Sequence, residues 1–213
     1  MATKYLPWNP ARLAQIYMSV GAAVWQGQGV EDTLAKLISL ALAATEADAR
    51  AMAVAALGAG GLDVLVNNAS ILGPIPRPQL LDFPLEALEQ VYRTNVIAPL
   101  ALVQSLRHAF KAGARVINVT SDAGVEPYAG WGGYGSSKAA LEQLSAVLAA
   151  ENPALKVYWV DPGDMRTQMQ QDAFPGEDIS DRLPPEASVP GFLRLIADGL
   201  PSGRYSARAL EQA

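Results

Sequence analysis

A phenol and an ammonium lie four residues apart in the segment 134–138, at Tyr134 and Lys138. The segment opens a stretch typical of a helix, and residues i and i+4 lie on the same helix face. A free phenol has a pKa of about 10, which is too high for a good general base near neutral pH. A nearby cation favours the phenolate and shifts a pKa by roughly 1–3 units. Lys138 is therefore expected to lower the pKa of Tyr134.

Two polar residues earlier in the chain extend this pair. Ser121 follows an apolar run, and Asn95 lies 26 residues before it. A serine hydroxyl at this point can hold a substrate oxygen against the Tyr134 hydroxyl. Positioned acid–base groups typically contribute about 10²–10⁴-fold to a rate. The four residues predict proton transfer to or from a carbonyl or alcohol oxygen while hydride moves at carbon, without a metal ion.

The elements that position these residues alternate between apolar runs and helical patterns. Short apolar runs bounded by glycine or polar residues are typical of buried parallel strands. Such strands alternating with helices predict an α/β fold with a parallel sheet and helices on both faces. Strands are expected at 62–66, 115–120, 155–160 and 204–206, and helices at about 84–95, 99–111, 135–150 and 189–199, with loops at 71–83, 122–133 and 164–190.

Polar or glycine-containing residues follow three of the expected strands. Asn67 ends the first, Ser121 the second, and Pro162-Gly163 comes just after the third. In open parallel sheets the ligand lies outside the carboxyl ends of the strands. The three strand ends therefore predict a single crevice.

These residues, in this order, resemble the short-chain dehydrogenase/reductase family. The Y-x-x-x-K pattern alone is weak, but the other features occur in register with it. The resemblance covers about residues 61–207, and Ser70 stands where the family usually has glycine. The matching features are Asn67-Asn68-Ala69, Asn95 within Thr94-Asn95-Val96, Ser121, Tyr134-x-x-x-Lys138, and Pro162-Gly163 followed by Thr167.

The resemblance implies a catalytic role for four residues. Tyr134 would be the general acid/base, and Lys138 would lower its pKa and bind the nicotinamide ribose. Ser121 would orient the substrate oxygen, and Asn95 would hold a water in a proton relay toward Lys138. The implied substrate is a small carbonyl compound or alcohol.

The resemblance also implies a nicotinamide cofactor, NAD or NADP, with no residue that reveals the choice. Asn67 and Ala69 would lie against its adenosine side. Pro162, Gly163 and Thr167 would lie against the nicotinamide, together with Tyr134 and Lys138. Residues 164–190 would form the substrate lid.

Residues 1–60 depart from the family pattern. The family begins with a strand, the motif T-G-x-x-x-G-x-G and a helix that holds the pyrophosphate, and no such motif occurs here. Residues 16–20 could be a first strand with 21–29 as a remodelled phosphate loop, or residues 1–60 could form a mostly helical cap without a phosphate site. We favour the cap. The expected fold is a single Rossmann-like domain over 1–213 whose N-terminal strands are reduced or replaced by helices, with a catalytic core at 61–213.

Three functions compete for this pattern. An NAD(P)-dependent oxidoreductase explains the complete set of catalytic residues. A non-enzymatic binding or scaffold protein with impaired dinucleotide binding explains the missing glycine motif, and ranks second. A sugar-nucleotide epimerase or dehydratase ranks low, because only about fifty residues follow Gly163.

The composition limits the partners and the location expected for the protein. A net charge of −5 without a basic cluster argues against nucleic-acid binding. The absence of cysteine is compatible with a cytoplasmic location. The uncharged stretch 13–30 contains too many polar residues to span a membrane. Family resemblance implies a homodimer or homotetramer, with helix 135–150 and the helix before it as interface candidates.

Overall fold

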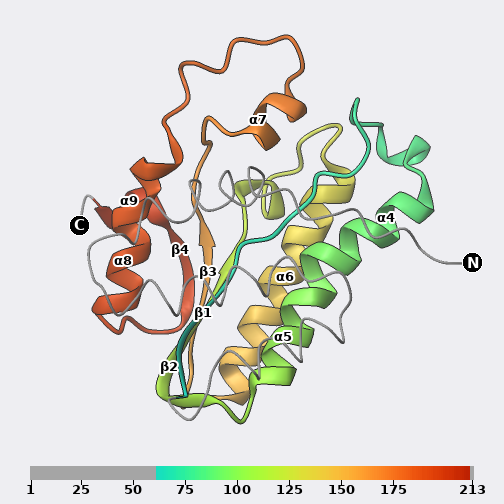
Figure 1. The fold of residues 1–213 in the computed structure, drawn as a ribbon. Coiled ribbons are helices and arrows are strands. Elements are labelled where there is room, and N and C mark those ends of the chain that lie inside the picture. The colour runs from blue at the N-terminus through green and yellow to red at the C-terminus, as the bar shows by residue number, and fades with distance from the viewer. Residues whose placement is uncertain (1–60, 212–213) are drawn as a thin grey trace, which may run out of the picture.

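The structure is a computed structural model that describes residues 61–211. Within this range, four parallel strands form one sheet in the order β1-β2-β3-β4. In Figure 1 the strands run side by side with helices to either side of them. The strands are β1 (Leu62–Asn67), β2 (Phe110–Val119), β3 (Lys156–Asp161) and β4 (Gly203–Ser206).

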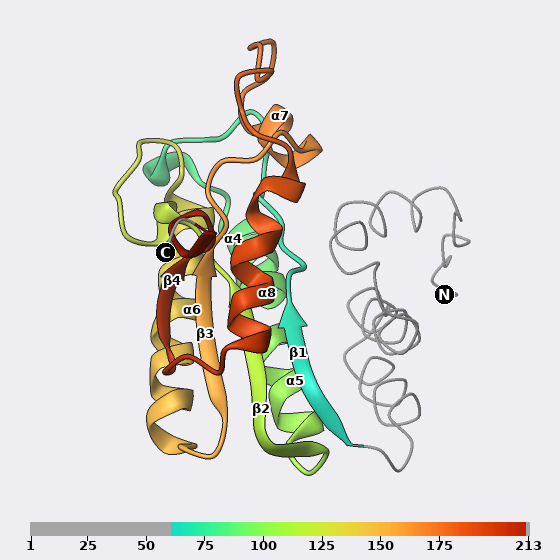
Figure 2. The same ribbon diagram turned by 90° about the vertical axis from the view of Figure 1, so that its left-hand side faces the viewer.

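Helices cover both faces of the sheet, as Figure 2 shows. One face carries α4 (Leu85–Tyr92), a π-helical turn (Arg93–Ile97), α5 (Ala98–Leu106) and α6 (Gly132–Glu151). The other face carries α8 (Val189–Ala197), which packs against the short α9 (Ala207–Glu211). The six-residue helix α7 (Gln168–Ala173) lies beyond the carboxyl ends of the strands. Short 3₁₀ turns occupy Leu80–Asp82, Asp122–Gly124 and Pro185–Ser188.

The core has two halves, one on each face of the sheet, because alternate side chains of a strand point to opposite faces. Val116 of β2 packs toward α5 with Val103 and Leu106. Its neighbour Ile117 packs toward α8 with Leu195. All of these side chains are buried, which explains why the strands read as continuous apolar runs. The predicted α/β fold with a doubly covered parallel sheet is confirmed for the described residues.

One predicted helix boundary was wrong. The helix expected to run to about residue 111 ends at Leu106, and β2 begins at Phe110. Phe110 pairs with Leu62 of β1, and Gly113, at φ +75°, donates its N–H to the carbonyl oxygen of Ala154 at 3.0 Å. Pairing with a distant strand outweighs local helix propensity here.

The alternatives for residues 1–60 lie outside the described residues, as do the helices expected there. Among the described helices, none has the length and apolar character needed to cross a bilayer.

Candidate functional site

Helix α6 carries the tyrosine and the lysine one turn apart near its N-terminal end. Lys138 is only 2% exposed, and its Nζ donates a hydrogen bond to the carbonyl oxygen of Val119 at 2.8 Å. The same Nζ lies 5.4 Å from the centroid of the Tyr134 ring. The ammonium and the phenol are therefore neighbours inside the fold.

Gly135 sets how closely α6 approaches the turn that follows β2. A Cβ atom at this position would lie 2.5 Å from the carbonyl oxygen of Ala123, and that oxygen belongs to rigid backbone. Ser121 caps the turn, and its Oγ accepts a hydrogen bond from the N–H of Ala123 at 3.2 Å. The glycine thus permits the contact that brings Ser121 and Tyr134 to the same pocket.

Burial is the largest influence on the pKa of both Tyr134 and Lys138 on α6. It raises the pKa of Tyr134 to about 12, and the neighbouring hydroxyls of Ser121 and Ser70 oppose the increase. It lowers the pKa of Lys138 to about 8. The shift in the pKa of Tyr134 is opposite to the lowering we expected from Lys138, because loss of hydration outweighs the hydrogen bonds from the two serine hydroxyls. At neutral pH the phenol is protonated and the ammonium is mostly charged.

Asn95 connects the loop after β1 to α6. Its side chain is 1% exposed. The Oδ1 atom accepts from the N–H of Ile71 at 2.9 Å, and Nδ2 donates to the carbonyl oxygen of Ile71 at 3.0 Å and to Ser137 Oγ at 2.9 Å. Ser137 in turn donates to the carbonyl oxygen of Tyr134 at 2.6 Å. Asn95 therefore holds the loop after β1 beside Tyr134.

The π-helical turn around Asn95 has a local cause. Pro99 follows at the start of α5, and a proline lacks the N–H that would bond to the carbonyl oxygen four residues earlier. That oxygen belongs to Asn95. Single π turns of this kind are frequent at functional sites.

Asn67 begins a buried chain of polar side chains. Its Nδ2 donates to Asn118 Oδ1 at 2.7 Å, and Asn118 Nδ2 donates to Ser145 Oγ at 2.7 Å. These bonds join the carboxyl ends of β1 and β2 to α6. The Oδ1 atom of Asn67 is buried without a hydrogen-bond partner in the described part of the chain.

The carboxyl end of β3 forms a tight turn. Gly163 adopts φ +75°, and its N–H donates to Asp161 Oδ1 at 2.8 Å. The carbonyl oxygen of the preceding Pro162 accepts from Ser188 Oγ at 2.6 Å. Thr167 then caps α7 through its side-chain oxygen. The turn thereby links the end of the sheet to the segment that covers it.

A pocket of about 560 Å³ opens between these strand ends and α7. The predicted residues that line it are Ser121, Tyr134, Pro162, Gly163 and Thr167. Three others, Asn67, Asn95 and Lys138, are buried and do not line it, while Ala69 is exposed. Other lining residues are Leu72, Arg77, Thr120, Asp122, Ala123, Tyr128, Ala129, Trp131, Asp161, Asp164, Met165, Met169, Gln170 and Phe174.

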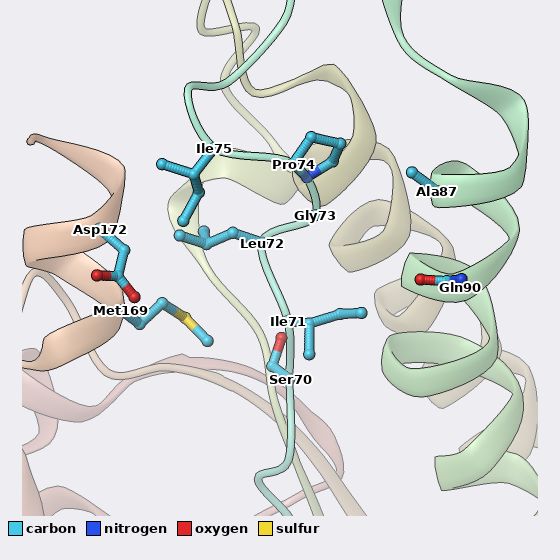
Figure 3. A pocket seen from close by; sticks show the side chains of 10 residues that line it. All are labelled: Ser70, Ile71, Leu72, Gly73, Pro74, Ile75, Ala87, Gln90, Met169 and Asp172. Atoms are coloured by element: carbon cyan, nitrogen blue, oxygen red, sulfur yellow. The ribbon is translucent and has the colours of Figure 1, made fainter. Parts of the chain in front are cut away.

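A second pocket of similar volume adjoins the first and shares Leu72 and Met169 with it. Figure 3 shows Met169 and Asp172 of α7 on one side of the loop 70–75, and Gln90 of α4 on the other. The loop after β1 thus separates α4 from the segment that covers the strand ends.

Sequence reasoning missed several residues of this site. Asn118 could have been found, because an amide within an otherwise apolar strand requires a buried partner. Ser137 lies between the tyrosine and the lysine, and its small polar side chain gave no distinctive signal. Arg77 lies in a proline-rich loop, where the sequence offers no periodicity that would direct it toward the pocket. No cluster of metal-ligating side chains occurs within residues 61–211.

Known proteins resemble this chain in sequence and in structure. A family model described as short chain dehydrogenase matches residues 12–178. The match begins well before residue 61, where our sequence reasoning placed the start of the resemblance. Sepiapterin reductase of Mus musculus is 34% identical over 112 residues, which are 51% of this chain and 43% of that protein. Benzil reductase ((S)-benzoin forming) of Bacillus subtilis is 37% identical over 113 residues, which are 50% of this chain and 46% of that protein.

Solved structures of short chain dehydrogenases and other oxidoreductases have a similar fold. An oxidoreductase from E. coli has a TM-score of 0.72 and 28% identity, over 78% of this chain and 70% of that one. A protein from Escherichia coli assigned to the short chain dehydrogenases, and solved in complex with NADPH, has a TM-score of 0.71 and 29% identity, over 78% and 72%. The chain spans about half the length of the curated relatives described above.

Proposed function

Because the chain belongs to the short-chain dehydrogenase family, we propose that it is an NAD(P)-dependent oxidoreductase that interconverts a carbonyl compound and a secondary alcohol. One observation carries the proposal: Tyr134 and Ser121 line the same pocket, and the Lys138 ammonium is buried beside the Tyr134 ring. A proton donor, an oxygen-binding hydroxyl and a fixed positive charge thus meet at one place.

The protonation of Tyr134 favours reduction at neutral pH. With a pKa of about 12 the phenol keeps its proton and can donate it to a carbonyl oxygen. Ser121 Oγ donates to Asp122 Oδ1 at 2.9 Å, and a hydroxyl can rotate to donate to a substrate oxygen instead. A bound nicotinamide cofactor supplies the hydride that adds to the carbonyl carbon. The carbonyl oxygen takes its proton from Tyr134, and the product is the alcohol.

Lys138 and Asn95 support the return of a proton to Tyr134. The ammonium stabilises the phenolate left after proton donation, since opposite charges close together favour the ionised form. The carbonyl oxygen of Asn95 lacks its usual helical donor, because Pro99 has no N–H. It is therefore suited to hold a water between Lys138 and solvent.

Residues at the strand ends fit a nicotinamide dinucleotide. The hydrogen bond to Val119 uses one of the three N–H groups of Lys138, which leaves two for ribose hydroxyls. The buried Oδ1 of Asn67 has no partner among the described residues and can accept from the cofactor. Ala69, Pro162, Gly163 and Thr167 would complete the contacts. A similar structure was solved with NADPH, and titration with both cofactors distinguishes NADP from NAD.

Direct titration of the protein with NADH and NADPH tests this proposal. Fluorescence or calorimetry should detect saturable binding of at least one cofactor. Reduction of small ketones and diketones should then oxidise the bound cofactor, measured by the loss of its absorbance. Absence of binding at millimolar concentrations of both cofactors would remove the enzyme proposal and favour a binding or scaffold role.

We also propose that the chain assembles as a homodimer or homotetramer. Two large apolar side chains near α4 face solvent in the single chain: Leu85 is 70% exposed and Ile97 is 51% exposed. Contact between copies of the chain would remove such side chains from water. Light scattering after size-exclusion chromatography should give a multiple of the chain mass of 22.5 kDa, and a monomeric mass would contradict this proposal.

A further inference from the structure

The pocket that Tyr134 lines has more acidic than basic residues. Three of its lining residues are acidic and only one, Arg77, carries a cation. Two of the acidic groups accept hydrogen bonds near the strand ends. Asp122 accepts from Ser121 and from the Tyr128 hydroxyl at 3.0 Å, and Asp161 accepts from the N–H of Gly163. Arg77 comes from the proline-rich loop after β1.

Arg77 lines this pocket with a guanidinium that forms no ion pair among the described contacts. Its Nη1 atom is buried and has no hydrogen-bond partner in the described part of the chain. An unsatisfied donor is costly once it is removed from water, and a charged group more so. Burial lowers the pKa of Arg77 and the charge of Glu177 opposes this shift, yet the two residues form no ion pair among the described contacts.

Two aromatic rings hold the guanidinium in place. Its Cζ lies 4.1 Å from the centroid of the Trp131 ring and 5.0 Å from that of Phe174. A planar guanidinium that stacks on aromatic faces keeps the N–H groups at its edge free to form paired hydrogen bonds with a carboxylate. Pre-ordering of the side chain also reduces the entropy lost when a ligand binds.

The location of Arg77 relates it to the reacting centre. The Trp131 ring that it covers lies 5.7 Å, centroid to centroid, from the ring of Tyr134 in an edge-on arrangement. The guanidinium and the proposed proton donor thus contact the same indole ring, and both line one pocket. A substrate whose carbonyl reaches Tyr134 can place a group about one aromatic ring away against Arg77.

We propose that Arg77 is a specificity-determining residue that binds a carboxylate of the substrate, so that the preferred substrates are oxo acids with about one ring's length between carbonyl and carboxylate. This inference rests on the proposed carbonyl reduction. It adds the class of substrate: an aromatic or similarly sized apolar body with an anionic end. Trp131 and Phe174 would contact the body.

A pair of near-isosteric compounds tests the inference. 4-Acetylbenzoate carries the carboxylate across one ring from a ketone, and 4-acetylbenzamide replaces it with a neutral amide of similar shape. Wild-type protein, Arg77→Met and Arg77→Lys are compared with Arg182→Met. Arg182 also lies over the Phe174 ring, at 5.2 Å, but is paired with Asp181 and does not line the pocket.

Binding is measured by calorimetry and turnover by cofactor oxidation. Wild-type protein should prefer the acid over the amide by on the order of 10–100-fold, the usual range for hydrogen bonds to a charged group. Arg77→Met should bring this ratio close to one, Arg77→Lys should keep only part of it, and Arg182→Met should retain it. The ratio removes general effects of a variant on stability.

The outcomes separate this inference from the proposed function. Turnover of the amide with no preference for the acid would overturn the role of Arg77 and leave the oxidoreductase proposal standing. Acid-selective binding that depends on Arg77, without turnover of either compound, would support the anion site and contradict the catalytic proposal. If Arg77→Met and Arg182→Met weaken the binding of both compounds equally, Arg77 only packs against Phe174. Failure of wild-type protein to bind either compound would also overturn the inference.

Discussion

Replacement of Asn95 by alanine offers a test of how the site is held together. The side chain makes three hydrogen bonds, two to the backbone of Ile71 and one to Ser137. It is 1% exposed, so water cannot replace the lost partners without rearrangement. The substitution leaves an N–H, a carbonyl oxygen and a hydroxyl without this partner.

The expected loss of stability follows from these bonds. A buried polar group that loses its partner costs about 1–3 kcal/mol. Ile71 is 37% exposed, so its backbone groups regain some hydration, and Ser137 keeps its bond to Tyr134. We therefore expect a decrease of about 2–4 kcal/mol in the free energy of unfolding, a large part of the 5–15 kcal/mol typical of domains.

Urea unfolding followed by circular dichroism measures this quantity. Asn152→Ala is a suitable control, because Asn152 Nδ2 makes one hydrogen bond, to the carbonyl oxygen of Leu148 at 2.9 Å, near the end of α6. Loss of that single bond should cost about 0.5–1.5 kcal/mol. Equal losses in the two variants, or a loss below about 1 kcal/mol for Asn95→Ala, would refute the view that Asn95 joins the loop to α6.

Two further predictions concern protonation. Because the pKa of Lys138 falls from 10.5 in the unfolded chain to about 8 in the fold, the unfolded chain binds more protons between these values and stability rises with pH there. Between pH 7 and 9.5 the free energy of unfolding of the wild-type protein should therefore rise by about 2 kcal/mol relative to that of Lys138→Met, measured by urea unfolding. A difference between the two proteins that does not change with pH would contradict the burial of a titrating ammonium. The hydroxyl of Ser70 lowers the pKa of Tyr134, so Ser70→Ala should move the pH profile of alcohol oxidation to higher pH; an unchanged profile would show that Ser70 does not act on the phenol.

The strands, and the positions of the proposed catalytic residues relative to them, could be predicted from the sequence for physical reasons. Buried parallel strands require continuous apolar runs, and their carboxyl ends meet at one edge. Residues that follow such runs, such as Ser121 and Gly163, could therefore be assigned to one crevice. The i, i+4 relation of Tyr134 and Lys138 needs only the geometry of a helix.

Other features depend on contacts between distant segments. The length of β2 follows from pairing of Phe110 with Leu62, which no local pattern reveals. The upward shift in the pKa of Tyr134 depends on its burial, and burial is a property of the assembled fold. Arg77 reaches the pocket through stacking on Trp131 and Phe174, which lie in two other segments of the chain.

The most direct test of the proposed chemistry is the turnover number of Tyr134→Phe, measured beside its affinity for NADPH and NADH. The variant keeps the ring that contacts Trp131 and removes only the hydroxyl. Loss of a positioned proton donor should lower kcat by about 10²–10⁴-fold or more, while cofactor affinity stays within a few-fold of the wild type. Turnover close to the wild-type value, with the same cofactor bound, would contradict the assignment of Tyr134 as the general acid/base.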